Sequence, residues 1–188
     1  VPVSATGAST SGTISDGATF KGLADQLPDF STSYVYTFVS SYGEEGPPSA
    51  ASTVITTDDN AVITVSNLST AGAKSNNNFG SSAGTKRIYR SNTGSNTTAF
   101  QFVAEVAMAT TSYDDTSKNA DLAEIIPSTY WIAPPDDDSS TYPDGPMKGL
   151  TALPNGIFAG FTGKRLCFSE AFVPYAWPIN YRITLEDP

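Results

Sequence analysis

The chain has 188 residues, a formal net charge of −9, no histidine and a single cysteine. At about 150 residues per domain, this length predicts one domain or two small ones. The lack of histidine removes the commonest general base and metal ligand, and Cys167 alone supports neither an intrachain disulfide framework nor a cysteine-based zinc site. A chain this acidic is not expected to clamp nucleic acid, which requires a basic face. No apolar run approaches the ~18 residues of a membrane span.

Composition favours an all-β fold. Serine and threonine make up about a quarter of the chain, aromatic residues 11% and charged residues only 15%. Threonine and aromatic residues favour pleated strands, whereas the helix formers Glu, Lys and Arg are scarce. Because the chain starts at Val1 without methionine and stops at Pro188 just after a strand-like run, we expect it to be part of a longer protein.

Residues 1–30 are predicted to form an N-terminal arm. The first fifteen residues are small and polar, and we expect them to be extended. Apolar residues then recur at helical spacing, with Asp16 as a candidate N-cap and Pro28 as the stop. This arm is therefore predicted to contain one short helix.

Residues 31–132 are predicted to form an antiparallel fibronectin type III-like β-sandwich. Alternation of period two begins at Tyr34 and runs to Val39 with apolar residues on both faces, so we expect this strand to be covered on both sides. Further strands are expected within 50–57, 61–65, 86–90 and 100–106, with turns between them. The predicted core consists of Tyr36 or Val35 together with Ile63, Ile88, Phe100 and Phe102.

The last third of the chain changes in composition. Residues 119–126 are expected to form one or two helical turns. Residues 133–147 are rich in proline and aspartate and are predicted to be a stiff linker. Residues 148–188 then carry a predicted hairpin (157–162 and 165–169) and a last strand (181–185), the opening of a small propeller-like segment. A segment of this size is too small to bury its own core, so we expect it to pack against the sandwich, against further chain or against a neighbouring copy.

Few residues suggest chemistry. Asp136, Asp137 and Asp138 with Asp144 could hold a calcium ion through hard oxygen ligands, but the EF-hand pattern is absent and a solvated linker is the favoured interpretation. Asp114-Asp115 is interpreted as a turn rather than an acid/base pair. There is no Gly-x-Ser-x-Gly elbow and no phosphate-binding glycine loop.

Other candidates also have a structural interpretation. Lys86, Arg87 and Arg90 beside Tyr89 are predicted to be a solvated strand face rather than a nucleic-acid patch. Cys167 is expected to be an inert buried thiol. The aromatic and proline-rich stretch 168–178 is interpreted as a rigid corner in preference to a ligand pocket. We therefore assign no catalytic, cofactor-binding or metal-binding residue and expect that the protein is not an enzyme.

Four segments in order resemble a known family. The run Tyr34–Val39 with Gly43–Ser49 resembles the late strand and exit turn of fibronectin type III-like modules. Residues 87–90, 102–106 and 111–116 resemble the module that follows it in tailed-bacteriophage virion proteins. Residues 148–150, 154–157 and 168–178 are similar to the start of a propeller-like region in a tail nozzle or tube-end protein. The resemblance covers residues 30–188.

This resemblance implies a structural role in a phage tail. It implies a nozzle or tail-hub component, assembled in the host cytoplasm, that forms a ring of identical copies around the genome channel and docks other tail or adaptor proteins. DNA would pass through the channel without specific binding, and no membrane span is expected. The alternative is a secreted or cell-surface fibronectin-like spacer or carbohydrate-binding module of a bacterial protein. Acidity and serine/threonine richness suit both interpretations.

Overall fold

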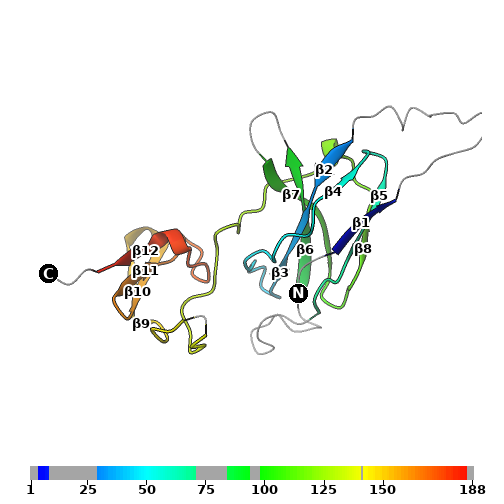
Figure 1. Ribbon diagram of the computed structural model, residues 1–188. Coiled ribbons are helices and arrows are strands. Elements are labelled where there is room, and N and C mark those ends of the chain that lie inside the picture. Colours follow the sequence, from blue (N-terminus) through cyan, green and yellow to red (C-terminus); the bar gives the residue numbers. More distant parts are fainter. Residues whose placement is uncertain (1–3, 9–28, 71–83, 94–97, 141, 186–188) are drawn as a thin grey trace, which may run out of the picture. The chain divides into compact units, whose positions relative to one another are not determined.

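The computed structural model describes residues 4–8, 29–70, 84–93, 98–140 and 142–185, and for 4–8 it describes the backbone only. The short helix predicted between Asp16 and Pro28 lies outside these residues. The chain divides into two compact units (Figure 1). The first comprises residues 1–43 and 48–127, and the second comprises residues 44–47 and 128–188.

The first unit consists of three antiparallel sheets. Their strands, in chain order, are β1 (Ser4–Ala8), β2 (Phe30–Thr32), β3 (Tyr34–Val39), β4 (Ile55–Thr57), β5 (Val62–Ser66), β6 (Thr85–Thr93), β7 (Thr98–Ala107) and β8 (Tyr113–Asp115). The sheet orders are β1-β5-β8, β3-β6-β7 and β2-β4. The predicted all-β class is therefore confirmed, and a single 3-10 turn, η2 (Asn119–Asp121), stands where one or two helical turns were expected.

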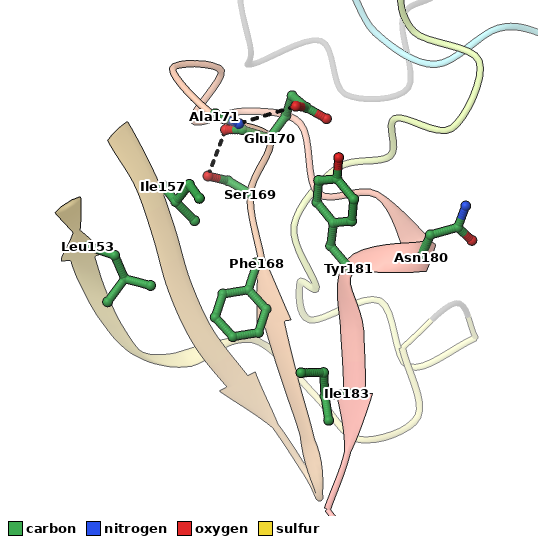
Figure 2. Close-up of a pocket in the computed structure, with 9 residues that line it drawn as sticks. All are labelled: Leu153, Ile157, Phe168, Ser169, Glu170, Ala171, Asn180, Tyr181 and Ile183. Carbon is green, nitrogen blue, oxygen red and sulfur yellow. Dashed lines mark hydrogen bonds between the residues drawn. The ribbon is translucent and has the colours of Figure 1, made fainter. Parts of the chain in front are cut away.

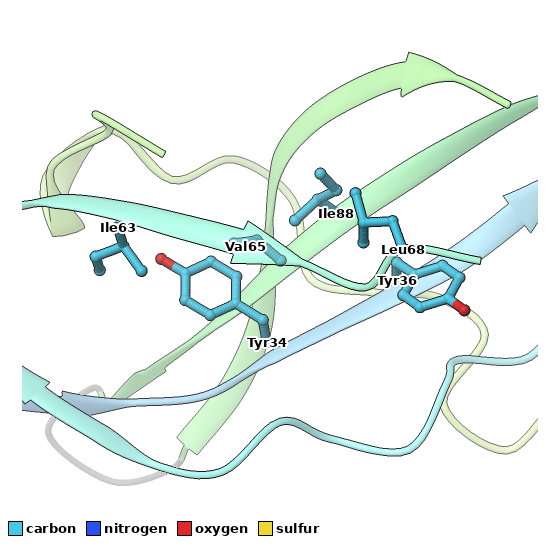
Figure 3. Packing of buried hydrophobic residues seen from close by; sticks show 6 residues of the cluster. All are labelled: Tyr34, Tyr36, Ile63, Val65, Leu68 and Ile88. Atoms are coloured by element: carbon cyan, nitrogen blue, oxygen red, sulfur yellow. The ribbon is translucent and has the colours of Figure 1, made fainter. Parts of the chain in front are cut away.

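The main core lies between the β3-β6-β7 sheet and the strand β5 (Figure 3). Alternate residues of β3 point into it, because successive side chains of a strand face opposite ways. They meet the two inward side chains of β5 and one from β6. The cluster of buried residues is Tyr34, Tyr36, Ile63, Val65, Leu68 and Ile88.

Strand β3 is covered on both sides, as predicted. Its opposite face contributes Val35 to a second buried cluster with Tyr89 and Ile126. Ile126 reaches this face because residues 123–126 run antiparallel to β7, with Ile126 N donating to Phe100 O at 2.9 Å. Both Val35 and Tyr36, which the sequence offered as alternatives, are therefore core residues.

The prediction that Phe100 and Phe102 belong to the same core as Ile88 is wrong. Both are half-buried and pack against the second cluster, on the outer face of the sheet. The cause is a register shift in β7, where Ile88 pairs with Ala104 but Tyr89 pairs with Phe102. The extra residue is a β-bulge, which reverses the side-chain alternation from that point on.

The second unit is one four-stranded antiparallel sheet of order β12-β11-β10-β9. Its strands are β9 (Lys148–Leu153), β10 (Ile157–Thr162), β11 (Arg165–Phe168) and β12 (Arg182–Thr184), with 3-10 turns η3 (Pro154–Gly156) and η4 (Ile179–Tyr181) between them. The segment 133–147 is attached to this sheet, since Thr162 Oγ1 donates to Gly145 O at 2.7 Å. It also folds back on itself, with Met147 N donating to Pro135 O at 3.0 Å.

Candidate functional site

The prediction that Lys86, Arg87 and Arg90 form a solvated strand face is wrong. Lys86 and Arg90 are 0% and 1% exposed. Arg87 is the partly exposed member of the three, and its Nε lies 2.9 Å from Glu105 Oε2 on the neighbouring strand. Each of the two buried cations has its partners inside the first unit, which the alternation of the sequence alone does not reveal.

Arg90 forms a buried ion pair. Its Nη1 lies 2.9 Å from Asp115 Oδ2, and this carboxylate oxygen also accepts a hydrogen bond of 2.7 Å from Tyr34 Oη. The guanidinium further donates to Ser117 O and Asn119 Oδ1 and lies over the Phe30 ring. Burial and the neighbouring carboxylate of Asp115 raise the pKa of the Tyr34 hydroxyl, so it stays protonated and donates a hydrogen bond. The group joins β3, β6 and β8, which favours a structural role.

Lys86 is the second buried cation. Its Nζ donates to the backbone carbonyls of Ser69 and Thr110. Burial lowers the pKa of this amine to about 8. The amine is enclosed and holds two loops together, so it is not accessible to a phosphate group.

The aspartates of 136–144 do not converge. Asp136 Oδ1 accepts from Asp138 N at 2.9 Å, and Asp138 Oδ1 accepts from Ser140 N and Oγ, which are the bonds of consecutive Asx turns. Asp144 lies 3.9 Å from Arg165 Nη1. Within the described residues, no three His, Cys, Asp or Glu side chains come together in a way that could hold a metal ion.

Cys167 is buried, as expected from the sequence. It lies in β11 with 0% exposure, and burial raises the pKa of its thiol. A thiol with a raised pKa is a weak nucleophile.

The stretch 168–178 is a compact corner closed by its own backbone. Glu170 N donates to Ala176 O, and Val173 N and Ala176 N donate to the residues three before them. Trp177 is 2% exposed, and its Nε1 donates to Pro174 O at 3.0 Å. Phe172, in contrast, is 79% exposed with φ +61°, a conformation that costs a bulky side chain energy. The corner holds this ring at the surface, over Gly156.

One face of the second unit's sheet is apolar and exposed, and we call it the apolar face. Directly paired residues lie on the same side of a sheet, so the pairs Leu153–Ile157, Ala159–Phe168, Phe161–Leu166 and Leu166–Ile183 place their side chains together. The large residues of the apolar face are Leu153, Ile157, Phe161, Leu166, Phe168, Tyr181 and Ile183.

A shallow groove of about 420 Å³ follows the apolar face (Figure 2). Leu153, Phe168 and Ile183 line its length, and Ser169, Glu170 and Asn180 lie at one end. Ser169 Oγ is already used, because it accepts from Phe158 N and donates to Glu170 O. The groove therefore offers mainly hydrophobic contact, with the carboxylate of Glu170, the amide of Asn180 and the hydroxyl of Tyr181 as its other polar groups, which suits a protein surface better than a reacting substrate.

Sequence reasoning identified part of this face. The strand predicted over 181–185 contains Tyr181 and Ile183, which alternate with the polar residues Arg182 and Thr184. Leu153 was missed because 148–153 was not predicted as a strand, since Gly149 and the short apolar run hide its period. The alternation predicts which side is apolar, but whether another element covers that side is a tertiary property.

No family model, no curated protein and no solved structure matches this chain. In the part of the chain that the structure describes, no helix is long and apolar enough to cross a membrane.

Proposed function

We propose that this chain is a structural component of a bacteriophage tail, of the nozzle or tail-hub type. It assembles with identical copies as a ring around the channel through which the genome passes, and it docks other tail proteins. Assembly takes place in the host cytoplasm and the product is part of the virion. The role is mechanical rather than catalytic.

The observation that carries this proposal is the exposed apolar face of the second unit. A sheet with one apolar side is stable when that side is buried against another element. Exposed apolar surface of this kind marks a protein contact more often than a small-molecule site. The resemblance of residues 30–188 to virion proteins of phage tails suggests that the contact belongs to a tail assembly.

The electrostatics of the first unit support passage of DNA without retention. Lys86 and Arg90 are occupied by carbonyl and carboxylate partners within the unit. The chain as a whole carries −9. An acidic wall repels the phosphate backbone, whereas a basic wall would bind it through counterion release.

Mass photometry and electron microscopy of the purified chain test the proposal. We expect closed rings of one fixed copy number. A spacer or carbohydrate-binding module, the alternative, would remain a monomer at every concentration, and that result would reject the ring. Binding to a glycan array with no ring formation would favour the alternative directly.

A further inference from the structure

We infer that the apolar face is where a second copy of this chain packs, sheet against sheet and with each strand of one copy running opposite to the equivalent strand of the other. This inference rests on the proposed assembly from identical copies and names the contact surface and its geometry. Two arguments carry it, one from area and one from charge.

The area of the face matches what a specific contact needs. Leu153, Phe161, Tyr181 and Ile183 are 37%, 44%, 44% and 53% exposed. With about 200 Å² for a fully exposed large side chain and smaller parts from the half-buried members, the face leaves roughly 500 Å² uncovered. Two such faces together would bury about 1,000 Å², the lower limit for a specific protein interface. Sheets pack face to face at about 10 Å, so the side chains of two copies can interdigitate.

The charges at the two ends of the face are opposite. Glu170 lies at the end where Leu153 pairs with Ile157. Lys148 pairs with Phe161 at the other end, and Lys164 lies in the turn that joins β10 to β11 there. The two ends are marked by Ile157 and Phe161 of β10, which are four residues or about 13 Å apart along the strand. The face is therefore acidic at one end and basic at the other.

This polarity favours a second copy as the occupant. A two-fold axis perpendicular to the strands places the Glu170 end of one copy over the lysine end of the other, and the reverse contact follows by symmetry. If equivalent strands of the two copies ran in the same direction, ends of like charge would lie together. A two-fold contact closes on itself, so it joins copies in pairs, and a ring requires a second, different contact as well.

Sedimentation velocity of the full 188-residue chain over a concentration series tests the inference. Ile183→Lys places two unpaired charges in the contact, and we expect it to weaken association at least about a hundredfold. Val54→Lys is the matched control, because Val54 is 68% exposed in the first unit and its substitution adds the same charge. Near-ultraviolet and far-ultraviolet circular dichroism of each variant reports that it is folded.

Charge reversal gives a second test that leaves the apolar side chains in place. Glu170→Lys alone should weaken association about tenfold, since both symmetric contacts become repulsive. Combining it with Lys148→Glu and Lys164→Glu should restore the wild-type value to within about threefold. Loss with Glu170→Lys followed by recovery in the triple variant requires opposite ends to meet, because contact between like ends would leave the affinity of Glu170→Lys nearly unchanged. A Glu170→Lys variant that associates like the wild type, or an unrestored triple variant, would overturn the arrangement.

The outcomes separate this inference from the proposed function. Rings that form equally well with Ile183→Lys overturn the inference and leave the ring intact. Pairs that Ile183→Lys abolishes, without any ring, support the inference and reject the ring. A wild-type chain that stays monomeric at about 100 μM, well above the Kd range of specific interfaces, overturns both and leaves the face to a partner of another kind.

Discussion

Removing the carboxylate of Asp115 should destabilise the first unit and leave the second unit unchanged. Asp115 is 0% exposed and accepts hydrogen bonds from Arg90 Nη1 at 2.9 Å, from Tyr34 Oη at 2.7 Å and from Ser117 N at 2.8 Å. In Asp115→Ala the guanidinium stays buried without its counter-charge, and its Nε already lacks a partner. Breaking a buried pair in this way costs about 3–5 kcal/mol.

The positions of the two tryptophans allow a loss of stability to be assigned to one unit. Both tryptophans, Trp131 and Trp177, belong to the second unit, whereas strands of both units contribute to far-ultraviolet circular dichroism. In urea titrations, Asp115→Ala should move the circular dichroism transition of the first unit to lower urea with an unchanged m-value. The tryptophan fluorescence transition should stay where it is.

Asp114→Ala is the control for this experiment. Asp114 is the neighbouring residue of the same strand, and its exposed carboxylate accepts one hydrogen bond, from Thr64 Oγ1. Its removal should cost less than about 1 kcal/mol. If the two variants lose equal stability, or if the fluorescence transition moves with Asp115→Ala, the reasoning from the buried pair is refuted.

Three further predictions concern other parts of the chain. Burial lowers the pKa of Lys86 to about 8 in the folded chain, so above that pH the unfolded chain binds more protons than the folded one. The free energy of unfolding should therefore rise by about 1–2 kcal/mol from pH 8 to 9.5, which urea titrations at both pH values check. The control variant Lys86→Met should lack this rise. Gly156→Ala places a side chain at φ +70° and its Cβ against the Phe172 ring, so it should lose more stability, measured by the tryptophan fluorescence transition, than Gly145→Ala. The Gly145 variant incurs only the left-handed backbone cost of about 1–2 kcal/mol, because nothing lies within 4 Å of its Cβ, and equal losses would show that the ring contact contributes nothing. The purified assembly should have no measurable affinity for duplex DNA at ~50 mM salt in fluorescence anisotropy, and steeply salt-dependent binding there would contradict a repulsive channel wall.

The strands that the sequence predicted well are those whose pattern is local. Residues 34–39 and 157–162 match β3 and β10 at both ends. Both are short apolar runs bounded by turn residues, so the signal is contained in neighbouring residues. The strand predicted within 50–57, in contrast, is reduced to Ile55–Thr57, because Ser52 turns to bond the backbone of Tyr34 instead.

What could not be predicted depends on distant partners. The burial of Lys86 relies on carbonyls 17 and 24 residues away, and that of Arg90 on a carboxylate 25 residues away. The bulge opposite Ile88 and Tyr89 changes the face of Phe102 without any proline or glycine to mark it. In each case the missing information is the pairing of strands that are far apart in sequence.

The two units differ in how far apart in sequence their paired strands lie, and this has a consequence for folding kinetics. In the first unit Ala5 pairs with Val65, Tyr36 with Ile88 and Val65 with Tyr113. In the second unit each strand pairs with the next along the chain. Loop closure over some fifty residues is slow, whereas hairpins form within about 1–10 μs. After dilution from denaturant, the sheet of the second unit should form its hairpins before the long-range strand pairs of the first unit have formed. Its unprotected side would then meet unfolded chains first, so refolding yield should fall as protein concentration rises.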